Sequence, residues 1–160
     1  AEVETFIQLK NPEWQTQLPD VESLCQTAAT AAWRTAFDRE GSFEVAIVLA
    51  DDALVRELNR EYRSQDKPTN VLSFPADQDE PVLPGDVPTL GDIIIAFETT
   101  KSEAPDNLPN HLSHLVVHGC LHLLGFDHEN DKEAADMEGL ETQILAGLGI
   151  ADPYSEASNS

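Results

Sequence analysis

The feature that most restricts the fold of this chain is a row of histidines on one side of a predicted helix. All five histidines of the 160-residue sequence lie between His111 and His128. Four of them recur at intervals of three or four residues, which places them on one face of an α-helix. They are His111, His114, His118 and His122. The opposite face is apolar, with Leu112, Val116, Cys120, Leu123 and Leu124. We therefore expect a helix over about 109–124 that packs on a core and directs its imidazoles away from that core.

Three of these histidines have the spacing of a metal site. His118 and His122 are one helical turn apart, so both imidazoles can reach one ion. Gly125 then ends the helix, and His128 can fold back as a third nitrogen donor. Three imidazoles suit Zn²⁺ and leave a fourth position for water, as in catalytic zinc sites. The alternative is an exposed histidine-rich face without a ligand, which leaves the third histidine unexplained. We expect one zinc ion per chain.

Residues near this motif allow two interpretations each. Asp127 is either a hydrogen-bond acceptor that orients an imidazole or a turn residue. Asp92 is either a cleft residue or a turn carboxylate after Gly91, and we favour the turn. His114 either lines the entrance of the cleft or is a surface histidine with a satisfied hydrogen bond, which we favour. Cys120 lies on the apolar face, so we expect a small buried side chain and not a ligand.

The rest of the chain alternates strands and helices. Apolar runs predict strands over 3–9, 43–50, 69–75 and 90–97. Helices are expected over 21–40, after an N-cap at Asp51 or Asp52, and over 98–104, 109–124 and 131–148. A turn runs through Pro12 and Pro19, and a proline-rich acidic loop covers 76–89. This order predicts an α+β fold with one mixed β-sheet of about four strands packed with several helices, one of them a zincin-like metal-site helix. We expect a single catalytic domain over 1–154 and a polar tail over 155–160.

Charge and composition limit the partners. Thirty acidic against nine basic residues give a formal net charge of −21, which repels DNA and anionic membrane surfaces. No apolar stretch approaches the roughly 20 residues of a membrane span. Two cysteines suit a reducing compartment, so we expect a cytoplasmic protein with no membrane and no DNA partner. Four of the nine basic residues form a local patch that an RNA can meet. They are Arg56, Arg60, Arg63 and Lys67. For Arg56 and Arg60 the alternative is a solvated helix face with salt bridges.

The histidine spacing also matches the metzincin protease pattern His-Glu-x-x-His-x-x-Gly-x-x-His, except at one position. Gly119 stands where those proteases carry the glutamate that activates water. Because glycine cannot accept a proton, peptide hydrolysis by that route is disfavoured. A metal site of similar geometry is still expected.

Longer segments resemble the YbeY family of bacterial endoribonucleases. The run from His118 to His128, HGCLHLLGFDH, looks like the signature of that family. Further segments resemble the family and occur in the same order along the chain as in the family. They lie at 58–63, 68–75 and 90–93, before this run, and within 137–154, after it. The departures are mild: Cys120 and Phe126 replace an expected serine and tyrosine, and the loop over 76–89 looks longer.

The resemblance implies a zinc-dependent, single-strand-specific endoribonuclease that matures the 3′ end of 16S ribosomal RNA and takes part in ribosome quality control. It implies His118, His122 and His128 as metal ligands, and catalytic roles for Arg63 and His118. The implied partners are single-stranded ribosomal RNA and a ribosomal protein or ribosome-associated GTPase. The alternatives are a zinc metallopeptidase-like hydrolase and a non-catalytic, metal-stabilised module that binds the ribosome.

Overall fold

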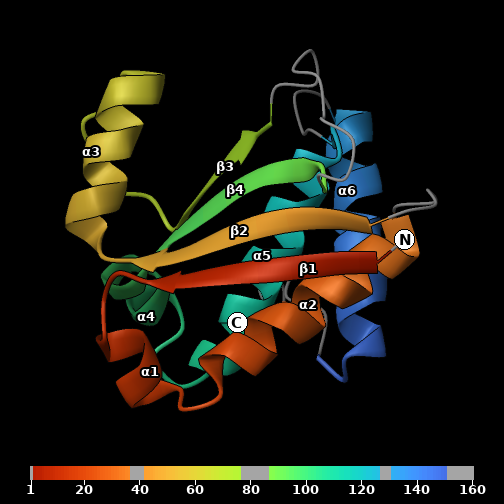
Figure 1. Ribbon diagram of the computed structural model, residues 1–160, viewed down its shortest axis with the longest axis horizontal. Coiled ribbons are helices and arrows are strands. Elements are labelled where there is room, and N and C mark those ends of the chain that lie inside the picture. The colour runs from red at the N-terminus through yellow and green to blue at the C-terminus, as the bar shows by residue number, and fades with distance from the viewer. Residues whose placement is uncertain (1, 37–41, 77–86, 127–130, 151–160) are drawn as a thin grey trace.

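The computed structural model describes residues 2–36, 42–76, 87–126 and 131–150 (Figure 1). Its strands are β1 (Glu2–Leu9), β2 (Ser42–Ala50), β3 (Val71–Pro75) and β4 (Thr89–Ala96). Its helices are α1 (Glu13–Gln17), α2 (Val21–Ala36), α3 (Asp52–Arg63), α4 (Phe97–Glu103), α5 (Leu108–Leu123) and α6 (Asp131–Gly147). The expected α+β fold, with one mixed sheet of about four strands and several helices, is confirmed.

The sheet has three parallel strands and one antiparallel edge strand. The strand order is β1-β2-β4-β3, with β1, β2 and β4 parallel and β3 antiparallel to β4. The central strand β4 is buried continuously from Ile93 to Ala96 because helices cover both faces of the sheet there. Among the described residues β3 pairs only with β4, so its other edge is open.

The helices cover the two faces of the sheet unequally. α2, α5 and α6 pack together against one face, around a core that includes Ile47 and Ile93. α3 covers part of the other face, where Val55 packs with Leu72. Figure 1 shows α3 standing apart from α2 and α6. The end of α3 contacts β3, which brings it to the open edge of the sheet.

The segment predicted as a turn between Pro12 and Pro19 contains the short helix α1, so this prediction is wrong. Trp14 is fully buried, and its indole Nε1 donates a hydrogen bond to the carbonyl oxygen of Ala50 at 2.9 Å. The helix is therefore held by a contact with the end of β2, which the local sequence does not reveal.

The other predicted elements lie within two residues of their expected bounds, as far as they are described. Asp51 is the N-cap of α3, since its side chain accepts a hydrogen bond from the Leu54 N–H at 2.9 Å. The end of the predicted helix over 21–40 beyond Ala36, the loop centre at 77–86 and the tail over 155–160 lie outside the described residues. The single domain over 1–154 stays a prediction. None of the described helices has the length and apolar character needed to cross a bilayer.

Candidate functional site

The predicted histidine row lies on α5. Leu112, Val116 and Cys120 are buried on its opposite side, as expected. Burial raises the pKa of the Cys120 thiol well above its ordinary value, as for a core residue and not for a metal ligand. The histidines are not fully exposed either: the His118 side chain keeps 22% of its accessible surface.

His118 and His122 bring two nitrogens to one point. Their Nε2 atoms are 3.0 Å apart, and their rings are nearly perpendicular at 75°. Two nitrogens bound to the same tetrahedral zinc at ordinary bond lengths lie about 3.3 Å apart, so this spacing fits a shared ion. Among the described residues, no three histidine, cysteine or carboxylate side chains form a complete metal-binding group. The expected third ligand, His128, and its neighbour Asp127 lie outside the described residues.

A buried carboxylate from α6 holds His118, one member of this pair, together with His114. Glu141 has no exposed surface. It accepts hydrogen bonds from Nδ1 of His118 at 2.6 Å and from Nε2 of His114 at 2.8 Å. An ionised carboxylate only accepts hydrogen bonds, so in its ionised form Glu141 places the His118 proton on Nδ1. The lone pair of Nε2 then faces His122, which is the tautomer that binds a metal.

Glu141 was missed as a site residue when the sequence was analysed, although it fell within one of the resembling segments. A signal was present in its spacing on α6. It shares a helical face with Met137, Ile144 and Leu145, which are all buried. An acidic residue within such an apolar face needs a partner, since burying a lone carboxylate is costly. The favoured interpretation of His114 as a hydrogen-bonded residue is confirmed, but its side chain is only 15% exposed.

A cleft of about 570 Å³ opens in front of the two histidines. It is lined by the end of α3, the segment before β3, the open edge of β3 and the end of α5. The lining residues are Arg63, Thr69, Asn70, Val71, Ser73, Pro75, His118, His122, Gly125 and Phe126. The structure therefore brings Arg63 and the histidine pair together, as the sequence analysis expected. Gly125 has a φ of 96°, which favours glycine and turns the chain at the rim of the cleft.

The open edge of β3 presents backbone donors to this cleft. Bonds from Ala96 N to Asn70 O at 2.9 Å and from Ala76 N to Leu90 O at 3.2 Å flank the β3–β4 ladder. In an antiparallel pair such bonds recur at every second residue. The backbone groups of Val71 and Ser73 therefore point away from β4, and both residues line the cleft.

Several other predicted residues lie away from this cleft. Asp92 is an exposed strand residue of β4, opposite Phe74, so neither its turn nor its cleft interpretation holds. Arg56 forms an ion pair with Asp66 at 2.8 Å on the solvent side of α3, which confirms its interpretation as a solvated salt bridge. The hydrogen bond and charge of Arg56 hold the pKa of the Asp66 carboxyl below its usual value. Arg56 and Arg60 line a hollow beside α3 that is separate from this cleft.

Gly119 faces the sheet and not the cleft. A Cβ atom at this position would lie 2.9 Å from Cγ2 of Ile93 on β4. A glutamate at 119 would therefore meet the core of the protein. The missing metzincin carboxylate has a steric reason here, because α5 packs closely on β4.

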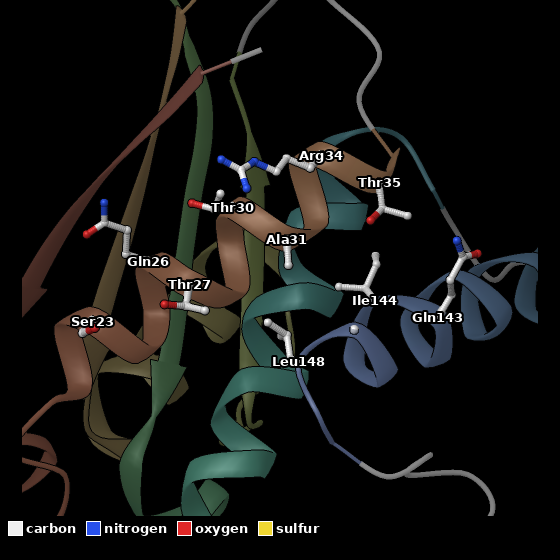
Figure 2. Close-up of a pocket in the computed structure, with 11 residues that line it drawn as sticks. Ser23, Gln26, Thr27, Thr30, Ala31, Arg34, Thr35, Gln143, Ile144 and Leu148 are labelled. Carbon is white, nitrogen blue, oxygen red and sulfur yellow. The ribbon is translucent and has the colours of Figure 1, made fainter.

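A second cavity, of about 610 Å³, lies between α2 and α6. Figure 2 shows Thr27, Thr30 and Ala31 along α2, with Ile144 of α6 and Leu148, which directly follows α6, beside this helix. Arg34 is the one charged residue in its described lining, which contains no histidine, cysteine or carboxylate. This second cavity lacks groups for metal binding or proton transfer. The cleft at the histidine pair is therefore the candidate functional site.

Comparison with known proteins places this chain in a family. The family model of Endoribonuclease YbeY matches residues 7–149. The chain belongs to the YbeY family. Arg63, His118, His122 and Glu141 all fall within the matched range.

YbeY relatives match nearly the whole chain. The chain is 52% identical over 159 residues to Endoribonuclease YbeY of Paramagnetospirillum magneticum, covering 96% of this chain and 97% of the relative. It is 53% identical over 148 residues to the Bradyrhizobium diazoefficiens protein of the same name, covering 89% and 80%. The solution structure of TM1509 from Thermotoga maritima is similar with a TM-score of 0.55 and 26% identity, covering 89% of this chain and 87% of the other.

Proposed function

We propose that this protein is a zinc-dependent endoribonuclease that cleaves single-stranded RNA. We propose that its substrate is the 3′ end of 16S ribosomal RNA, and that it acts in ribosome quality control in the cytoplasm. Its membership of a family named for endoribonuclease activity supports RNA cleavage. The observation that carries the proposal is the pair of Nε2 atoms 3.0 Å apart in a cleft that Arg63 also lines.

In this proposal His118, His122 and His128 hold one zinc ion. The described pair fits such an ion in spacing, and Glu141 fixes the tautomer that binding requires. When bound, the ion would supply a Lewis acid for a phosphoryl oxygen of the scissile linkage.

The side chains and backbone of the cleft bind and orient the RNA. Arg63 is always charged and can donate two parallel hydrogen bonds to phosphate oxygens, so it offsets the charge that develops on the phosphoryl group. The backbone N–H groups of Val71 and Ser73 donate hydrogen bonds to oxygen atoms of an RNA strand that lies along β3. The net charge of −21 repels RNA elsewhere, so binding depends on this local site and on partners such as a ribosomal protein or a GTPase.

The attacking oxygen belongs either to water or to the 2′-hydroxyl of the RNA, since Gly119 supplies no carboxylate base. The two routes leave different ends on the product. A 2′,3′-cyclic phosphate would identify the 2′-hydroxyl as the nucleophile, whereas direct attack by water would leave no cyclic product. Mass spectrometry of the cleaved RNA distinguishes them.

The test uses the purified protein and a single-stranded RNA that carries the 16S 3′ end with its precursor extension. We expect one zinc per chain by elemental analysis and cleavage that a chelator abolishes and zinc restores. His122→Ala should abolish cleavage, whereas His111→Ala, on the same helix but outside the cleft lining, should not. Cleavage by His122→Ala at the wild-type rate would refute the proposal.

The same variant separates the alternatives. A metallopeptidase would cleave casein and lose this activity in His122→Ala. A non-catalytic module would show no cleavage, and His122→Ala would lose folding or partner binding together with the metal.

A further inference from the structure

One aromatic side chain next to the cleft has a role still unassigned. Tyr62 is 68% exposed, more than any other large apolar residue described; Phe6 follows at 50%. It directly precedes Arg63, which lines the cleft. An exposed tyrosine offers an aromatic face and a polar hydroxyl to a ligand.

The Tyr62 ring is held in place although it is exposed. It contacts Phe74 of β3 edge-to-face, with ring centroids 5.4 Å apart and an interplanar angle of 63°. Phe74 lies between Ser73 and Pro75, two residues of the cleft lining. Because side chains alternate along a strand, Phe74 points to the α3 side of β3 while its neighbours face the cleft. The two aromatic rings therefore lie directly across the edge strand from the cleft.

The chain segment after Tyr62 is also fixed. The side chain of the buried Asn59 donates a hydrogen bond to the carbonyl oxygen of Lys67 at 2.9 Å. The Gln65 N–H donates to the carbonyl oxygen of Asn59 at 3.2 Å, and Ser64 caps α3 in the left-handed conformation. These contacts hold the backbone of the last turn of α3, which carries Tyr62 and Arg63, against the following loop.

We propose that Tyr62, supported by Phe74, stacks on one base of the single-stranded RNA whose phosphate Arg63 contacts. An exposed ring beside a cationic side chain is the combination that binds single strands without reading their sequence, since every base offers an aromatic face. Arg60, Arg63 and Lys67 supply positive charge around this end of α3, where Glu61 and Asp66 are the nearby carboxylates of the sequence. The inference rests on the proposed RNA-cleaving function and adds to it a position for one nucleotide.

The first test measures RNA binding and cleavage by three variants. Tyr62→Phe keeps the aromatic face and should behave like the wild type. Tyr62→Leu keeps an apolar contact with Phe74 but cannot stack, and Tyr62→Ala removes both. We expect Leu and Ala variants to weaken the binding of a single-stranded oligonucleotide about 5- to 100-fold, with a matching rise in KM and a smaller change in kcat. Phe6→Ala, an exposed aromatic on the opposite edge strand β1, is the matched control and should change neither.

The second test locates the stacked base. A series of oligonucleotides each carries one abasic nucleotide at a successive position. Wild-type protein should lose affinity at one position, and Tyr62→Leu should lose that penalty while keeping those at other positions. The inference is overturned if Tyr62→Leu binds the RNA as tightly as the wild type, or if its affinities for the abasic series follow the wild-type pattern. It is also overturned if Tyr62→Leu binds RNA normally but no longer binds a protein partner. Failure of the wild type to cleave refutes the proposed function separately, because the binding measurements do not depend on cleavage.

Discussion

Replacing Glu141 with glutamine tests whether this buried carboxylate fixes His118, one member of the histidine pair. Glutamine keeps the shape but carries one acceptor oxygen and one NH₂ group. It can therefore accept from only one of His114 and His118, whose bonds to Glu141 are 2.8 and 2.6 Å. A hydrogen bond to a charged group contributes about 1.5–3 kcal/mol, so losing one should lower the free energy of unfolding by about 2 kcal/mol without metal.

The effect on metal binding should be separate and additional. If the NH₂ group faces His118, the imidazole must move its proton to Nε2 and loses the lone pair that a metal needs. Loss of such a supporting carboxylate lowers metal affinity about 10- to 100-fold. With zinc in excess, the difference in the free energy of unfolding between the wild type and Glu141→Gln should therefore grow further, by about 1.4–2.7 kcal/mol.

Urea unfolding with and without zinc, together with chelator competition, measures both quantities. Glu138→Gln is the matched control, since it removes one charge from the exposed side of the same helix. A Glu141→Gln protein whose free energy of unfolding matches this control within about 0.5 kcal/mol, half of a typical hydrogen bond, and whose zinc affinity lies within about twofold, would refute the assigned role.

Two further predictions concern α5 and the core. Gly119→Ala should lower the free energy of unfolding by up to about 2 kcal/mol, because a Cβ at 2.9 Å from Ile93 overpacks the helix–sheet contact at a cost of about 1–3 kcal/mol, against a gain in helix propensity of about 1 kcal/mol; urea unfolding that shows a more stable variant would contradict it. Burial, and to a lesser extent the Glu22 carboxylate, raises the pKa of the Cys25 thiol to about 12, against about 8.5 in the unfolded chain. The folded state keeps a proton that the unfolded state releases, so this stabilisation is complete below about pH 8.5 and declines as the pH rises towards 12. Between pH 7.5 and 10, the free energy of unfolding should decline less in Cys25→Ala than in the wild type. Equal declines in the two proteins would contradict this prediction.

The elements that the sequence predicted well are those with local, repeated signals. The spacing of histidines and apolar residues predicted α5, and the carboxylate of Asp51 marked the start of α3. The nearness of Arg63 to the histidine pair was expected from the family resemblance, since no local pattern connects α3 with α5.

The features that the sequence did not predict depend on contacts between residues far apart in the chain. α1 is only five residues long, too short for periodicity, and is held by Trp14 through a bond to distant Ala50. Gly91 suggested a turn before Asp92, but a Cβ there would collide with the carbonyl oxygen of Phe74, so the glycine allows β3 to approach β4. Glu141 acts through partners on another helix, and nothing in α6 alone identifies them.

The close packing of α5 on β4 also limits which side chains position 119 can carry. A side chain there must displace Ile93, whose Cγ2 lies 2.9 Å from the place of a Cβ atom. An acid at 119, as in peptide-cleaving zinc enzymes, would therefore need room made for it by the strand beneath the helix. The ligand spacing that the two kinds of sequence share does not by itself bring the same chemistry.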